Sequence, residues 1–260
     1  MFKKLGRDFY RKDAIELSKD LLGKYLVHMV NYKDNVKDGD NNNDGDSDNY
    51  IDSGNESILI GKIVETEAYM GFHDKGAHTY NGKRTPRTEV MYGEEGHAYV
   101  YFVYGMYHCL NVVAAEEGIA QAVLIRALEP IEGLNKMSFT RFNKPVSELG
   151  KKQIINLTNG PGKLCKAFNI SKDLNGEDLT KDKLYICRKK SEYTMHNQLK
   201  QLTENNKKNT ESQYNSEIQI YNETFNIVES KRIGIDYAEE AKDFLWRFYI
   251  EGNEFVSSLK

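Results

Sequence analysis

The chain has few cysteines and histidines and no long hydrophobic run, and each shortage excludes a class of protein. Its three cysteines are an odd number without a C-x-x-C spacing, which argues against a disulfide framework and a four-cysteine zinc or iron-sulfur site. The six histidines include no H-x-x-x-H pair or comparable cluster. We therefore expect neither a metal nor another cofactor.

The N-terminus MFKKLGRDFYRKDAIELSKDLLGKYLV lacks the continuous apolar core of a signal peptide, and no run approaches the length of a membrane span. We therefore expect an intracellular protein that binds no membrane. The Asn-rich character of two segments suggests a nuclear location if the source is eukaryotic, and a cytoplasmic one otherwise. Basic pairs such as Lys207-Lys208 are too short to indicate an import signal.

Two stretches of biased composition lower the mean hydropathy to −0.67. Residues at about 33–57 are nearly all Asp, Asn, Gly and Ser, and those at about 189–224 are rich in Asn, Gln, Lys and Glu. Such segments bury too little apolar surface to fold. Both are predicted to be disordered insertions in one domain over residues 1–260, whose remaining part of roughly 200 residues suits a single domain.

The chain outside the acidic insertion has a net positive charge. Residues 33–57 carry seven Asp, one Glu and two Lys, a net charge of −6, so the net charge of −3 for the whole chain leaves +3 elsewhere. A local basic patch therefore remains compatible with nucleic acid. Each candidate either belongs to such a patch or is an ordinary solvated cation. The candidates are Lys83, Arg84, Arg87 and Lys163.

The order of strand-like and helix-like segments predicts an α+β domain with a curved antiparallel sheet flanked by helices, because strands and helices do not alternate as in a parallel sheet. The first insertion separates two strands predicted to pair as a hairpin. Further expectations are a helix within 8–22 started by Asp13, strands meeting at Tyr104-Gly105, a strand ended by Pro130, a short helix after 160–162, and a strand, a short helix and a final strand from RIGI onward.

Two carboxylates stand out in the strand-like stretch GKIVETEAYMG. Because a strand alternates its side chains, Glu65 and Glu67 share one face with Tyr69. Burying an ionised carboxylate without a partner costs several kcal/mol. Either these acids lie solvated on a surface strand, or their face meets cations, donors or a wet cleft.

Arg126 lies inside the apolar run AVLIRAL, where a guanidinium must find a partner. Glu67 is one candidate, and a structural ion pair with Glu129 or Glu65 is the alternative. His78 lies in the loop-like stretch GAHTY, where a histidine is ordinarily polar surface but could bind the edge of a ligand.

Aromatic residues are dense around the same strands, which indicates either ordinary core or a pocket that stacks flat rings. Tyr104, next to a glycine at the expected hairpin tip, could project as a wedge into a base stack. The residues concerned are Tyr69, Tyr99, Tyr101, Phe102, Tyr104 and Tyr107.

Together these motifs resemble the alkyladenine (3-methyladenine) DNA glycosylase family, the single-domain type without a helix-hairpin-helix. The resemblance covers nearly everything except the two insertions, in family order. It is carried by FYRKDAIELSKDLLGKYLV, GKIVETEAYMGFHDKGAHTYNGKRTPRTEVMYG, GHAYVYFVYGMYHCLNVV, AVLIRALEPIEG, NGPGKLCKAFNI, and RIGI with WRFYIEGNEFVS.

The resemblance implies a role for each matching residue. Glu67 would activate the hydrolytic water, with contacts from Arg126 and the backbone carbonyl of Ile233. The damaged base would be held by Tyr69, His78, Tyr101 and Asn111, the last disfavouring the 2-amino group of guanine. Binding to DNA would involve Tyr104, which fills the gap left in the duplex, together with Met106, Arg84, Arg87 and Lys163.

The function implied is a monofunctional DNA glycosylase of base excision repair. A monomer would flip alkylated purines out of double-stranded DNA and hydrolyse the N-glycosidic bond, with deaminated and etheno purines as candidates for a wider range. No lysine in the motifs is placed as a Schiff-base nucleophile. Two other classes remain open: a damage sensor that flips bases without excising them, and a hydrolase of free nucleosides or sugars that uses Glu65 with Glu67.

Overall fold

The computed structural model describes residues 2–30, 57–103, 105–189 and 224–257. The two predicted insertions lie outside these residues except at their ends, and so does Tyr104.

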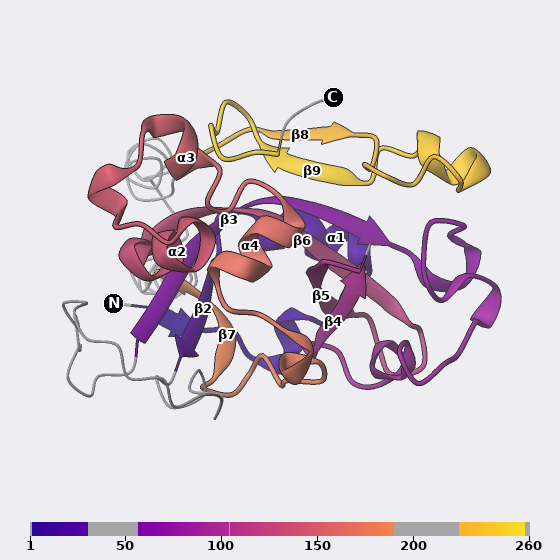
Figure 1. Ribbon diagram of the computed structural model, residues 1–260. Coiled ribbons are helices and arrows are strands. Elements are labelled where there is room, and N and C mark those ends of the chain that lie inside the picture. The colour runs from indigo at the N-terminus through magenta and orange to yellow at the C-terminus, as the bar shows by residue number, and fades with distance from the viewer. Residues whose placement is uncertain (1, 31–56, 104, 190–223, 258–260) are drawn as a thin grey trace, which may run out of the picture.

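One antiparallel sheet organises the described residues, and helices lie on both of its faces (Figure 1). Its main path runs β1-β7-β2-β3-β6-β5-β4, and β9 pairs with both β3 and β8. This arrangement confirms the predicted α+β class. The strands span Phe2–Lys4 (β1), Tyr25–Val30 (β2), Ser57–Tyr69 (β3), Ala98–Val103 (β4), Tyr107–Ala114 (β5), Gln121–Glu132 (β6), Leu184–Lys189 (β7), Ile227–Ser230 (β8) and Arg247–Ile250 (β9).

Helix α1 packs behind the sheet in Figure 1, whereas α2 and α4 lie in front of it. The α-helices span Ala14–Leu21 (α1), Leu134–Phe142 (α2), Lys151–Ile155 (α3) and Pro161–Ala167 (α4). Single 3₁₀ turns span Arg7–Phe9, Gly71–His73, Tyr80–Gly82, Glu89–Tyr92, Val146–Glu148, Lys172–Leu174 and Glu239–Asp243.

The first helix is shorter than the apolar spacing from residue 8 suggests. Asp13, the predicted start signal, is its N-cap, and its carboxylate accepts two backbone N–H groups of the first turn at 2.9 Å. The segment Arg7–Phe9 forms a separate 3₁₀ turn. The helix therefore begins at Ala14, where the cap satisfies its free donors.

Strand β3 is the centre of the sheet. Its first half pairs with β2, which confirms the predicted hairpin, and its second half pairs with β9, while β6 runs along its other edge. Neighbouring side chains of β3 point to opposite faces of the sheet. Thr66 points toward α1, where its hydroxyl donates to the Ser18 carbonyl at 2.9 Å. Glu65 and Glu67 both contact Arg126 on β6, which confirms that they share a face.

The prediction that Pro130 ends its strand is wrong, since β6 continues to Glu132. Pro130 lies opposite Gly61, next to a register shift between Ile60 and Gly61. A residue without an N–H group is tolerated at such an irregularity of the ladder.

The predicted strand at RIGI is also wrong, because β8 ends at Ser230 and residues 231–235 form a loop. The Arg232 guanidinium turns inward to Asp74, and the Ile233 N–H donates to a carboxylate oxygen of Glu67. Gly234 has a φ of +79°, a left-handed conformation that interrupts an extended strand. Contacts with the carboxylates of Asp74 and Glu67 thus take the place of the backbone hydrogen bonds that a strand would make in this segment.

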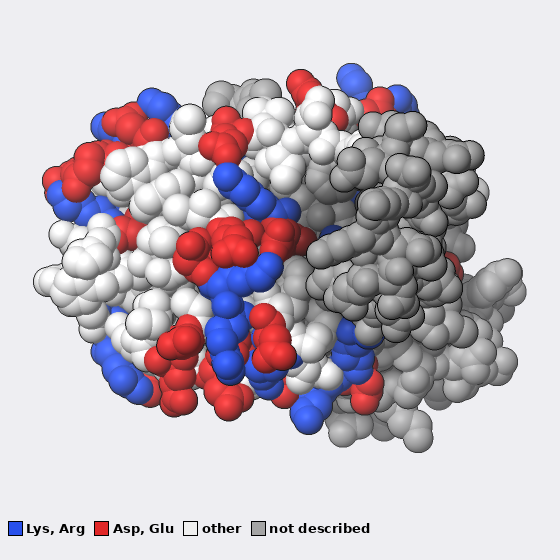
Figure 2. All heavy atoms as spheres, turned by 180° about the vertical axis from the view of Figure 1, so that it is seen from behind, with Lys and Arg blue, Asp and Glu red and all other residues white. Residues whose placement is uncertain are grey.

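The face of the molecule that Figure 2 shows, on the α1 side, carries Lys and Arg interleaved with Asp and Glu over its described part. One of the ion pairs along α1 joins Lys19 Nζ to Glu229 Oε1 at 2.6 Å. This part of the face therefore presents no field of a single sign. Among the described residues, no helix has both the length and the apolar character needed to cross a membrane.

Candidate active site

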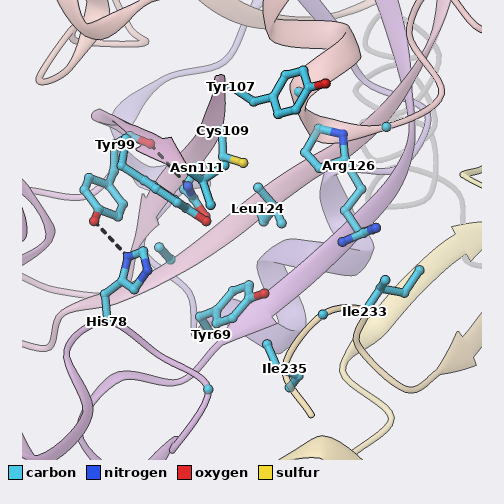
Figure 3. A pocket seen from close by; sticks show the side chains of 18 of the residues that line it. Tyr69, His78, Tyr99, Tyr107, Cys109, Asn111, Leu124, Arg126, Ile233 and Ile235 are labelled. Carbon is cyan, nitrogen blue, oxygen red and sulfur yellow. Dashed lines mark hydrogen bonds between the residues drawn. The ribbon is translucent and has the colours of Figure 1, made fainter. Parts of the chain in front are cut away.

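A cavity of about 660 Å³ is lined by β3 to β6, the start of α4 and loop residues 233–237 (Figure 3). Most of the side chains predicted to hold the base or the water meet there. Those that line it are Tyr69, His78, Tyr101, Asn111, Arg126 and Ile233, together with the predicted DNA-binding residue Lys163.

Glu67 lies directly behind this lining and has 0% exposed surface. Its Oε2 accepts the Tyr69 hydroxyl at 2.9 Å, and its Oε1 accepts the Ile233 N–H at 2.7 Å and lies 3.1 Å from Arg126 Nη1. The prediction for Ile233 concerned its carbonyl, whereas the observed contact to Glu67 is through its N–H. The Tyr69 ring, the Arg126 guanidinium and Ile233 lie beside one another in Figure 3. Because Glu67 is fully buried and has these partners, it does not lie solvated on a surface strand.

Glu65 is equally buried and serves as the centre of an ion-pair network. Its Oε1 accepts Arg126 Nε at 3.0 Å, Arg247 Nε at 2.6 Å and Ser257 Oγ at 2.8 Å, and its Oε2 accepts the Ser257 N–H at 2.7 Å. Arg126 therefore bridges both acids, and two carboxylates face two guanidiniums. Such a charge-balanced arrangement makes the burial of four ions tolerable.

A second buried pair, which the sequence interpretation missed, stands behind Tyr69. Arg232 donates to both carboxylate oxygens of Asp74 at 2.6 and 2.7 Å, and both side chains have no exposed surface. The guanidinium carbon lies 4.8 Å from the centre of the Tyr69 ring. Because Arg232 precedes Ile233, this pair fixes the loop that meets Glu67. The arginine inside the quoted RIGI motif was the available signal.

His78 lies on the other side of the cavity, where its Nδ1 is 2.9 Å from the Tyr99 hydroxyl (Figure 3). Its ring also meets the Tyr101 ring edge-on, with centroids 4.6 Å apart. Burial, aided by the charges of Arg87 and Lys83, lowers the pKa of His78 to about 4. The imidazole is therefore neutral at pH 7 and adds no positive charge to the cavity.

This shift predicts a pH dependence of folding. The unfolded chain binds a proton at His78 near pH 6.5, and the folded protein binds it only near pH 4. The contribution of His78 to the free energy of unfolding is therefore fully present above pH 6.5 and falls as the pH drops toward 4. We expect His78→Gln to lose less stability than the wild type over this window, as measured by urea unfolding. Parallel pH curves for the two proteins would contradict the assignment.

Asn111 and Cys109 lie on β5, with Tyr99 and Tyr101 on the paired strand β4. The Asn111 amide donates to the Tyr99 carbonyl at 3.3 Å, which fixes the direction of its side chain. Burial raises the pKa of the Cys109 thiol to about 11. The thiol therefore stays protonated at neutral pH and does not act as a nucleophile.

The predicted DNA-binding residues are spread more widely. The Arg87 guanidinium lies 5.9 Å from the Tyr101 ring centre, and Lys163 borders the cavity. Arg84 does not line the cavity and pairs with the exposed Glu89 at 2.5 Å. Met106, also outside the lining, is 67% exposed in the turn between β4 and β5. Tyr104 lies outside the described residues.

Metal ligands are not grouped at this site. Within the ranges that the structure describes, no three His, Cys, Asp or Glu side chains are placed to hold a metal ion. The polar groups of the cavity wall are instead hydroxyl, amide, imidazole and cationic groups, which suit an uncharged or cationic ring and an anion.

Comparison with known proteins identifies the family of this chain. A family model described as methylpurine-DNA glycosylase (MPG) matches residues 50–203. A Clostridium acetobutylicum protein provisionally named 3-methyladenine DNA glycosylase is 50% identical over 99% of this chain and 98% of its own length. Proteins with the same provisional name from Desulfitobacterium hafniense and Clostridium tetani are 46% and 47% identical, each over 98% of both chains. The chain belongs to the methylpurine-DNA glycosylase family and is a DNA glycosylase.

Proposed function

We propose that this enzyme flips alkylated purines out of double-stranded DNA and hydrolyses their N-glycosidic bond with a water activated by Glu67. The observation that carries this proposal is the carboxylate itself, buried directly behind an aromatic cavity and held by Tyr69, Arg126 and Ile233. A base stacked in the duplex cannot be reached, so the nucleotide must leave the helix before hydrolysis.

The cavity suits a flat, electron-poor ring. The Tyr69 and Tyr101 rings come from different strands and offer stacking surfaces, and stacking on an aromatic side chain contributes about 1 to 3 kcal/mol per base. A purine alkylated on a ring nitrogen carries positive charge, which an aromatic cage favours. The neutral His78 ring adds no repulsion to such a base.

Glu67 retains a place for water. Each carboxylate oxygen can accept two hydrogen bonds, and Oε2 accepts only the Tyr69 hydroxyl among the described residues. We propose that the water donates to this free position as the bound nucleotide tightens the site. Glu67 takes the proton, the water oxygen bonds to C1′ of the sugar, and the electron pair of the broken bond leaves with the base. The carboxylate charge also stabilises the cationic sugar as it develops.

The product should be an intact strand with an abasic site. Lys163 is the lysine in the cavity lining, and its amine donates to the side-chain oxygens of Asn156 and Asn159 at 2.7 Å each. Because both bonds hold the amine toward the protein, we propose that it does not attack the sugar.

Borohydride trapping and strand analysis test this proposal. With wild-type enzyme and a duplex that contains one alkylated purine, we expect strand scission only after alkaline treatment and no covalent adduct with borohydride. A borohydride-trapped adduct that disappears in Lys163→Gln would show that the enzyme uses lysine catalysis instead.

We further propose that the enzyme acts as a monomer and contacts the duplex through the turn around Met106 and the cations Arg84, Arg87 and Lys163. Met106 and Arg84 are exposed, as a contact with DNA requires.

A further inference from the structure

The ion pair of Arg232 and Asp74 lies against one face of the Tyr69 ring. Its two hydrogen bonds measure 2.6 and 2.7 Å, and neither side chain has exposed surface. The guanidinium carbon lies over the ring, 4.8 Å from its centre. Because Tyr69 lines the cavity and Arg232 does not, the cation stands on the protein side of the ring. The other face of the ring is the one that a base can stack on.

Both members of the pair are held by further contacts. The guanidinium also lies over the Trp246 ring, 5.0 Å from its centre. The Asp74 carboxylate accepts the backbone N–H groups of Met70 and Gly76 at 3.0 and 2.9 Å. Such N–H donors stabilise a carboxylate. The positive and the negative charge are therefore both fixed in position behind the ring.

Without Asp74, the charge of Arg232 would oppose a cationic base. Stacking of such a base depends on the negative face of the tyrosine ring. A base on the cavity face adds a van der Waals spacing of about 3.5 Å, so its charge lies roughly 8 Å from the guanidinium. At an effective dielectric constant of about 20, the repulsion between two unit charges at that distance corresponds to a factor of roughly 30 in Kd.

We propose that Asp74 is a specificity-determining residue, whose charge cancels that of Arg232 behind Tyr69 and so lets the cavity prefer a cationic base over a neutral base of the same shape. The inference rests on the proposed function, because it requires a base that stacks on Tyr69. A pair that only fixed the loop at Ile233 would serve both kinds of base equally. The preference between the two bases therefore distinguishes an electrostatic role from a structural one.

A matched pair of bases tests this role through binding. One duplex carries 7-methylguanine, which is cationic, and the other carries 7-methyl-7-deazaguanine, which has the same outline and is neutral. A 2′-fluorine on each sugar destabilises the sugar cation and so prevents base release. The quantity measured is the Kd for the neutral duplex divided by the Kd for the cationic one, and the fraction of folded protein cancels in this ratio. We expect a ratio above one for the wild type, and a ratio about 10-fold lower for Asp74→Asn.

Three further variants separate charge from structure. Glu239→Gln is the matched control, because it also removes one negative charge but from an exposed pair with Lys75 at 2.6 Å, where water screens it. Its ratio should equal that of the wild type. The double variant Asp74→Asn/Arg232→Gln removes both charges and should restore the wild-type ratio. Arg232→Gln alone leaves the carboxylate with its two backbone donors, and at pH 8 its ratio should exceed that of the wild type. This last variant carries the test if Asp74→Asn does not fold.

Several results would overturn the inference. They are a wild-type ratio of one or less, an unchanged ratio in Asp74→Asn, a double variant with a ratio as low as that of Asp74→Asn, and an Arg232→Gln ratio at or below that of the wild type. Weaker binding of both duplexes by the same factor would show that the pair is purely structural. Base release by the wild type from an alkylated duplex is scored separately, so the proposed function can stand if this inference fails.

Discussion

Glu67→Gln is expected to reduce single-turnover excision of an alkylated purine by about 10² to 10⁴. Glutamine keeps the size of the side chain and one oxygen that can accept from Tyr69 or Ile233. It removes the basic anionic oxygen, so the water is no longer deprotonated and the developing sugar cation loses its counter-charge. The rate should be measured with enzyme in excess over one alkylated duplex, which removes product release from the observed rate.

Affinity provides the control for this variant. Because Glu67 lies behind the cavity lining, Glu67→Gln should bind an abasic-analogue duplex with nearly the affinity of the wild type. The paired variant Glu65→Gln should retain much more activity per folded molecule. A Glu67→Gln enzyme that still excises, beside an inactive Glu65→Gln enzyme, would show that the base is assigned to the wrong carboxylate.

Glu65→Gln is expected to lower the free energy of unfolding by about 3 to 5 kcal/mol, the range for breaking a buried ion pair on one side. Arg247 is 2% exposed and would face an amide instead of a carboxylate, and Arg126 would keep one of its two carboxylate partners, Glu67. The amide NH₂ group would also meet the donors of Ser257 without being able to accept from them.

Denaturant unfolding measures this loss, with Glu254→Gln as the control from the same C-terminal region. Glu254 forms an exposed pair with Lys151 at 2.6 Å, and such surface pairs contribute little to stability. We therefore expect no measurable change for the control. Equal stability of Glu65→Gln and the wild type would mean that the network around Glu65 does not hold β3 to β9 and the C-terminal segment.

The period-two pattern of one strand was enough to place the two acids on a common face, and the shared contact with Arg126 confirms it. Their complete burial could not be predicted, because the groups that compensate Glu65 come from Arg247 and Ser257. These residues are far away in the sequence, and neither has a periodic or spacing signal of its own.

The two predictions that failed concern segments whose backbone is determined by residues distant in the sequence. The apolar residues of RIGI suggested a strand, but contacts across the fold to Asp74 and Glu67 determine its backbone. Pro130 suggested a strand end, yet the irregular register beside Gly61 accommodates it.

Release of a free base from DNA tests the central claim most directly. Wild-type enzyme is incubated with a duplex that contains a single alkylated purine, and in parallel with the corresponding free nucleoside, and the released base is separated by chromatography. We predict that the free alkylated base appears from the duplex, with one abasic site per base released, and that the nucleoside is a poor substrate. Tight binding of the duplex without release of the base, or release from the free nucleoside alone, would contradict the account.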